Sequence, residues 1–269
     1  MKSIADLEFS TVSLCEGIIW VSQMIRADFP VARVQTQLDE LVELAKASLS
    51  PTADYEQKIQ QLIDLFYHDG LFGSVSGIYT LSDVLWLDNV LNSKQGMPAS
   101  LGVIFLYIAQ QLNLPIKPVI FPTQLILLVV RKDNSDWYIN PQNGETLTRS
   151  LLNNWLKGSM GPLVQVADYP LEQAEHRLII RQLFDTMKAA LMEEKKMEMA
   201  LKVCETLLLL EPEEPYEIRD RGLILAHLDC DHAALPDLTY FVEHCPEDPI
   251  AEMIKIQIYS LNDQPVVLH

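Results

Sequence analysis

Three positions between Gly96 and Gly144 have the spacing of a nucleophile, a base and an orienting group, yet hold unsuitable side chains. Thiol-dependent acyl transfer needs a Cys whose thiolate is favoured by a helix N-terminus and by an adjacent His, which a carboxylate orients. At these positions the chain holds Pro98 at a predicted helix start, Gln124 at a predicted strand start, and Asn140 after the next strand. Proline has no nucleophile, and a side-chain amide takes up no proton near neutral pH. We therefore predict that the segment keeps the layout of such a site without its chemistry.

A relocated nucleophile is the alternative. Ser100 lies close to the helix start, but a serine needs a base, and all six histidines lie outside residues 96–144. His68 is the candidate base, although a capping Ser and a surface His are the simpler interpretations. No cysteine falls in the segment, so no catalytic residue is assigned. The candidate ligand cleft comprises Pro98, Gln124, Asn140, Ser100 and Trp137.

Apolar periodicity predicts the elements that would position these residues. Residues 98–112 carry a helical apolar stripe, and residues 116–121, 124–131 and 136–139 are predicted strands, the last two joined by a loop at 132–135. Residues 1–70 are predicted to be helical, and Ser82 or Asp83 to cap a short helix containing Trp86 and Val90. Asp83 and Asp88 are interpreted as a solvated helix face. The predicted fold class is α+β, with a small antiparallel sheet in a core at residues 78–147.

The C-terminal part repeats with a period of 34 residues. Pro212-Glu-Glu-Pro215 recurs as Pro246-Glu-Asp-Pro249, and Ala200 aligns with Ala234. This period is typical of helix-turn-helix repeats of the tetratricopeptide type, here residues 181–214 and 215–248, with a closing helix at 249–260. Gly222 occupies the small position of the second unit, whereas Lys188 departs from it in the first. The repeats either buttress the core or form a peptide-binding groove.

Charge and composition narrow the function classes. The net charge of -17 argues against direct binding to nucleic acid, and residues 181–269 alone carry eight Lys and Arg against eighteen Asp and Glu. A partner of the repeats is therefore expected to be a neutral or basic protein or peptide. No metal or cofactor motif, signal peptide or membrane-spanning run is found, and four cysteines without a paired motif are interpreted as neutral buried thiols. We expect a cytoplasmic protein that needs no cofactor.

Several longer phrases point to a family. Gly96-x-Pro98, Leu112-Asn-Leu-Pro115 and Trp137-Tyr-Ile-Asn140-Pro141-x-x-Gly144 resemble a transglutaminase-like, papain-type core. With Arg26-Ala-Asp-Phe-Pro30, Tyr216-Glu-Ile-Arg-Asp-Arg-Gly222 and Val267-Leu-His269, the whole chain resembles the bacterial SirB-like family. The resemblance implies a transglutaminase-like domain at residues 1–165, a connecting segment at 166–180 and tetratricopeptide repeats at 181–269. It also implies a regulatory role and identifies Pro98, Gln124 and Asn140 with the Cys, His and Asp positions.

A non-catalytic interaction or regulatory protein is the function that the residues favour. Gln124 and Asn140 would then hold a ligand's backbone by paired hydrogen bonds without cleaving it. The alternatives are a hydrolase or acyltransferase with relocated catalytic residues, and a transcriptional regulator that acts through protein partners. The oligomeric state is not predicted.

Overall fold

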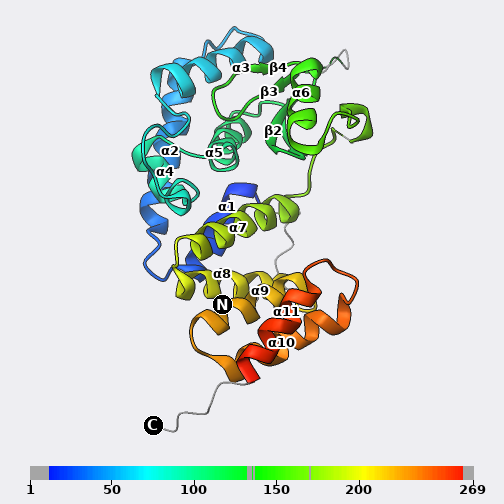
Figure 1. Ribbon diagram of the computed structural model, residues 1–269. Helices are drawn as coiled ribbons and strands as arrows, with labels where there is room; N and C mark the ends of the chain where they lie inside the picture. Colours follow the sequence, from blue (N-terminus) through cyan, green and yellow to red (C-terminus); the bar gives the residue numbers. More distant parts are fainter. Residues whose placement is uncertain (1–11, 132–134, 136, 170, 263–269) are drawn as a thin grey trace. The chain divides into compact units, whose positions relative to one another are not determined.

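The computed structural model describes residues 12–131, 135, 137–169 and 171–262. The chain divides into two compact units between residues 183 and 184, inside one helix, and the units are described separately (Figure 1). Some predictions lie outside the described residues: the helical region at 1–11, most of the loop at 132–135, and the strand start at 136.

The first unit is mostly helical. Its helices are α1 (Leu14–Ile25), α2 (Val31–Ser48), α3 (Tyr55–Ile63), α4 (Leu87–Ser93), α5 (Pro98–Gln111) and α6 (Arg149–Met160). Reciprocal side-chain caps begin two of them, at Ser13 before α1 and at Asp54 before α3. A π-helical turn, Asp64–Asp69, extends α3 and ends at Gly70.

The predicted helix around Trp86 is interrupted. A short 3₁₀ turn, Leu81–Val84, comes first, and α4 begins only after Trp86, which is extended. The carbonyl of Val84 accepts hydrogen bonds from the backbone of Met97 (3.2 Å) and the hydroxyl of Ser100 (2.9 Å). Because these tertiary partners use the Val84 carbonyl, the turn does not continue into α4. The prediction of one helix capped by Ser82 or Asp83 is therefore wrong.

Asp88 is buried in an ion pair. Its carboxylate accepts two hydrogen bonds from Arg26, at 3.2 and 3.1 Å, and the residue is only 5% exposed. The Arg26 guanidinium also lies over the Trp86 ring, 5.0 Å from its centroid. The interpretation of Asp88 as part of a solvated helix face is wrong.

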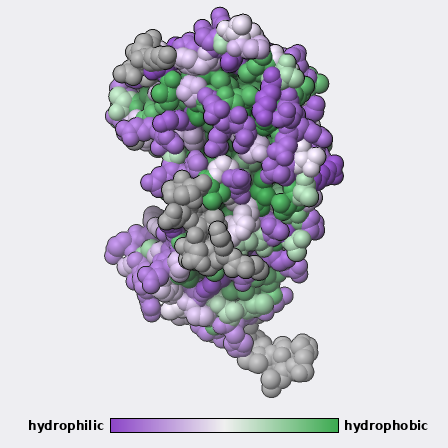
Figure 2. Space-filling view, turned by 180° about the vertical axis from the view of Figure 1, so that it is seen from behind, coloured by the Kyte–Doolittle hydropathy of each residue, from purple (hydrophilic) through white to green (hydrophobic). Residues whose placement is uncertain are grey.

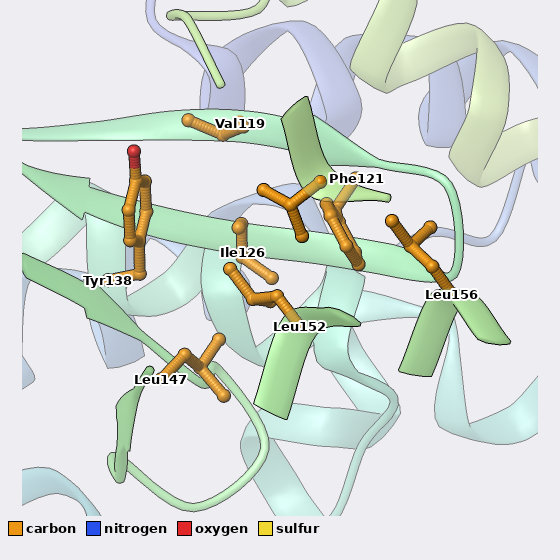
Figure 3. Packing of buried hydrophobic residues seen from close by; sticks show 8 residues of the cluster. Val119, Phe121, Ile126, Tyr138, Leu147, Leu152 and Leu156 are labelled. Carbon is orange, nitrogen blue, oxygen red and sulfur yellow. The ribbon is translucent and has the colours of Figure 1, made fainter. Parts of the chain in front are cut away.

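The sheet has four antiparallel strands in chain order: β1 (Ile116–Phe121), β2 (Gln124–Val129), β3 (Trp137–Ile139) and β4 (Thr146–Leu147). On one face, apolar side chains of all four strands pack against Leu152 and Leu156 of α6 (Figure 3). On the other face, α5 comes so close that a Cβ added to Gly102 would lie 2.9 Å from the Leu125 side chain. The sheet is thus covered by α5 on one side and α6 on the other, and the predicted α+β class is confirmed.

The second unit consists of stacked helices. It contains the end of α7 (His176–Glu193), then α8 (Met197–Leu210), α9 (Pro215–His227), α10 (Asp231–His244) and α11 (Ala251–Asn262). At Gly222 of α9 an added Cβ would lie 2.9 Å from Leu238 of α10, so the close approach of these helices explains the small residue. Ala234, Leu238 and Phe241 form a buried cluster with Ile254 of α11, the predicted closing helix.

Exposure differs from one cysteine to another. Cys15 and Cys204 are buried, Cys245 is half-buried and Cys230 is exposed. The expectation of four buried thiols is therefore wrong for Cys230.

The face drawn in Figure 2 is largely hydrophilic, with hydrophobic residues gathered in patches. Among the described residues, no helix is both long and apolar enough to cross a membrane.

Candidate functional site

The structure joins the two amides predicted to replace a His–Asp pair. The side-chain nitrogen Nε2 of Gln124 donates a hydrogen bond of 3.2 Å to Oδ1 of Asn140. Gln124 begins β2 and Asn140 follows β3, so strand pairing brings together residues sixteen apart in sequence. Gln124 is two residues from Ile126, and Asn140 is two residues from Tyr138; Ile126 and Tyr138 belong to the cluster that packs against α6. Because side chains alternate between the two faces of a strand, Gln124 and Asn140 lie on the face toward α6.

Asn140 also organises the turn that follows it. Its Oδ1 accepts a second hydrogen bond from the backbone of Gln142 (3.0 Å), and its carbonyl accepts one from Gly144 (2.8 Å). Its own N–H donates to the Glu145 carbonyl at 2.8 Å, and the residue is 7% exposed. The Asn140 side chain therefore helps to hold this turn in addition to bonding to Gln124.

Tyr67 holds the same turn from the π-helical segment. Its hydroxyl donates a buried hydrogen bond of 2.8 Å to the Pro141 carbonyl, and burial raises the pKa of this hydroxyl. Gly144 has a φ of +77°, and an added Cβ would lie 2.6 Å from the Tyr67 ring. No local pattern in the sequence points to Tyr67, because its contact with Pro141 spans 74 residues.

The start of α5 lies against the strands that carry the amides. Pro98 is the first residue of α5, where its fixed φ suits the helix and its missing N–H costs no hydrogen bond. One turn further along, a Cβ added to Gly102 would lie 2.9 Å from Leu125 and 3.2 Å from Pro141. These two residues directly follow Gln124 and Asn140. The helix therefore approaches both strands, with a proline at its first position.

Ser100 is engaged inside the protein. It is fully buried, and its hydroxyl lies 2.9 Å from the Val84 carbonyl and 3.0 Å from the Met97 carbonyl. The hydroxyl oxygen also accepts a hydrogen bond from the Met97 backbone at 3.1 Å. His68, considered above as its base, has a side chain that is 69% exposed and lies 3.9 Å from Asp64. The hydroxyl of Ser100 thus closes the first turn of α5 against the preceding loop.

Trp137 lies away from the amide pair. It is paired with Val129 at the far end of β2, five residues from Gln124, which corresponds to about 17 Å along a strand. Its indole donates to Thr146 at 3.2 Å, and the Arg131 guanidinium lies over its ring at 4.7 Å. Trp137 therefore packs the opposite end of β2 from Gln124 and does not join the amide pair.

The amide pair can donate and accept hydrogen bonds, but it holds no group that exchanges a proton near neutral pH. Gln124 is half-buried and so can reach a ligand, whereas Asn140 is nearly enclosed. Within the described part of the chain, no cluster of three or more His, Cys, Asp or Glu residues could hold a metal ion.

The repeat unit contains a buried charge cluster at the position that departs from the repeat pattern. Lys188, at the small-residue position, places its Nζ 2.7 and 2.8 Å from the two carboxylate oxygens of Glu217 and 2.8 Å from Asp220. The Lys188 and Glu217 side chains are 5% and 1% exposed. Burial alone would lower the pKa of Lys188, but the two carboxylates outweigh it and raise the pKa. Lys188 of α7 is therefore held to α9 by ion pairs, whereas a small residue at this position would let the two helices pack closely.

Comparisons with known sequences agree with this architecture. The model of the transglutaminase-like superfamily matches residues 32–185, and that of the tetratricopeptide repeat matches residues 187–259. The chain is similar to the protein SirB1 of Salmonella typhimurium, with 50% identity over 269 residues and 100% of both chains covered. It is also similar to the UPF0162 protein YchA of Escherichia coli K12, at 51% identity over 269 residues and 100% of both chains. The UPF0162 protein of Vibrio cholerae is 33% identical over 270 residues, again with 100% of both chains covered.

Proposed function

Because the chain belongs to the SirB1/UPF0162 family, with transglutaminase-like and tetratricopeptide repeat domains, we propose that it is a non-catalytic interaction or regulatory protein. The hydrogen bond from Gln124 to Asn140 carries this proposal. It joins the two residues that the family resemblance aligns with a base and its orienting acid, and neither amide exchanges a proton near neutral pH. In this proposal the core keeps its fold for recognition, and Gln124 offers hydrogen bonds to a ligand's backbone.

The repeats supply the surface for a protein partner. On α11 the side chains of Met253, Ile256 and Tyr259 follow one another at intervals of three residues and are 63%, 69% and 71% exposed. Exposed apolar side chains at this spacing form a helix face suited to another protein. The surplus of carboxylates in this region favours a neutral or basic protein or peptide in the cytoplasm and disfavours nucleic acid.

Relocated catalysis is the less favoured alternative. Ser100 would have to leave its buried bonds to the Val84 and Met97 carbonyls before it could attack a substrate. A regulatory effect on transcription is compatible with the proposal if it acts through a protein partner.

A pull-down from the native cell with the immobilised full-length protein tests the proposal. We expect a specific protein to be retained by the wild type and lost with Ile256→Ser, whose exposed position spares the fold. Lys157→Glu, an exposed change on α6, serves as the control and should retain it. Retention of no specific protein, or equal retention by the Ile256→Ser variant, would count against an interaction role for the repeats.

A further inference from the structure

A small apolar pocket lies between α2, α3, the π-helical turn and α5 of the first unit. The residues that line it are all apolar: Leu41, Leu44, Ala45, Leu62, Leu65, Phe66, Gly70, Phe72 and Ile108. Its volume is about 20 Å³, which is room for one water molecule or one methyl group. Because none of these residues has a side chain that can hydrogen-bond to water, a methyl group that displaces water from the pocket should gain affinity.

The floor of the pocket is tightly packed. Phe66 and Phe72 are each 3% exposed, and their rings stack with centroids 4.3 Å apart. The Phe66 ring also contacts the edge of Phe105, with centroids 5.4 Å apart, and Ile108 of α5 is 1% exposed. The floor is therefore formed by packing inside the unit and needs no rearrangement to receive a ligand.

Three leucines, here called the rim leucines, leave apolar surface in water beside this floor. Leu44 of α2 is 50% exposed, Leu65 of the π-helical turn is half-buried, and Leu71, between the lining residues Gly70 and Phe72, is 70% exposed. Leu71 also has a φ of +60°, which is unfavourable for leucine. The other described non-glycine residues with a positive φ are polar: Lys94, Asn113, Lys195 and Asp229. An exposed leucine in a strained conformation is typical of a segment that contacts a ligand.

The surroundings of the pocket are acidic. Four exposed acidic residues lie within four positions of the rim leucines: Glu40, Glu43, Asp64 and Asp69. The cationic groups in the same stretches are Lys46, 2.8 Å from Glu43, and His68, 3.9 Å from Asp64. The acidic residues therefore outnumber the cations around an apolar pocket. This combination complements an apolar side chain that has Lys or Arg near it.

From this arrangement we propose that the pocket is a docking point for a basic segment of another protein. The aliphatic end of one partner side chain, such as Leu, Ile or Met, enters the pocket between the rim leucines. Lys or Arg side chains of the same segment lie beside the four acidic residues. A second copy of this chain is a poorer occupant, because the same carboxylates would face one another. The docking point uses neither α11 nor the amide pair, so it goes beyond the proposed function of both.

A helical probe peptide of about 16 residues tests the docking point. The probe consists mainly of alanine and carries one Leu at its centre and one Lys a turn to either side. In fluorescence anisotropy with the full-length protein, we expect saturable binding at millimolar concentration or below. Amide NMR shifts should fall at residues 40–45 and 62–72. A probe with Ser in place of the Leu, and a probe with Glu in place of both Lys, should not bind measurably.

A pair of leucine variants locates the contact. Leu44→Gln should weaken binding of the lysine probe about fivefold, the change expected when about 40 Å² of apolar contact is lost. Leu178→Gln changes an equally exposed leucine outside the pocket, on α7, and should bind as the wild type does. The proposal is overturned if the lysine probe does not saturate, if the glutamate probe binds equally, if shifts fall elsewhere, or if the two leucine variants behave alike. Sedimentation of the protein alone adds a further refuting outcome, a dimer that Leu44→Gln disrupts.

Discussion

Replacement of Lys188 by Met should strongly destabilise the repeat unit. Methionine is similar in length but carries no charge, so Glu217 would remain 1% exposed without the cation that contacts both of its oxygens at 2.7 and 2.8 Å. Removing one partner of a buried ion pair typically costs about 3–5 kcal/mol. Asp220 contributes less to the loss, because Arg219 still donates to it at 2.6 Å.

A second substitution separates this charge effect from a packing effect. In the Lys188→Met background, Glu217→Gln replaces the buried carboxylate by a neutral amide and should recover more than about 1 kcal/mol. Lys255→Met, which removes an exposed lysine paired with Glu252 on α11, is the control and should cause no measurable loss. Urea unfolding of the full-length protein measures the stabilities. Hydrogen exchange of residues 184–262, compared with residues 98–129, locates the change.

The stabilising effect of Lys188 also has a defined pH range. Its pKa is raised in the folded protein by Asp220 and Glu217 against the opposing effect of burial, so the folded state holds the proton more tightly. The stabilisation is therefore complete below the unfolded pKa of about 10.4 and is lost as pH rises through the higher folded value. In Lys188→Met, burial raises the pKa of Glu217 without the opposing effect of the cation, so the difference in stability between wild type and variant should grow as pH rises from about 7 to 9.5. Equal stability of the two proteins at neutral pH, or no recovery with Glu217→Gln, would contradict the role given to this ion pair.

Two further predictions concern the core and the thiols. Gly144→Ala should destabilise the protein by about 2–4 kcal/mol in thermal or urea unfolding, because φ is +77° and the new methyl group would press on Tyr67. Gly158→Ala, in the exposed part of α6 with open space around it, is the control and should stabilise the protein by about 0.5–1 kcal/mol. Similar effects of the two substitutions on stability would contradict the assigned geometry. In the native protein, a thiol reagent should modify the exposed Cys230 quickly and leave Cys15 intact, because burial both shields the Cys15 thiol and raises its pKa. Peptide mass mapping of the labelled protein measures which thiols have reacted. Rapid labelling of Cys15 would contradict its burial.

Local patterns in the sequence predicted much of the fold. Pro98 marked the start of α5, the apolar runs around Pro122 marked the first two strands, and the 34-residue period located the stacked helices. These features depend on residues close in sequence. The break before α4 was not predicted, because it depends on the Val84 carbonyl being used by Ser100, sixteen residues away.

The candidate site was predicted only in part. The positions of Gln124 and Asn140 followed from the strand pattern, and the hydrogen bond between them needs the pairing of β2 with β3. Trp137 was grouped with them because it is near in sequence, but β3 carries it to the far end of β2. Lys188 stood out as a departure from the repeat, yet its partner Glu217 lies 29 residues further along the chain.

The proposed role of the core requires that it keep the layout of an acyl-transfer site without the chemistry. The decisive assay follows the purified protein for transfer of a fluorescent amine to a glutamine-containing peptide, and for hydrolysis of peptide amides. We expect turnover no greater than in buffer for the wild type, Gln124→Ala, Asn140→Ala and the Lys157→Glu control alike. Saturable turnover in the wild type and in Lys157→Glu that disappears in Gln124→Ala and Asn140→Ala would contradict a non-catalytic core.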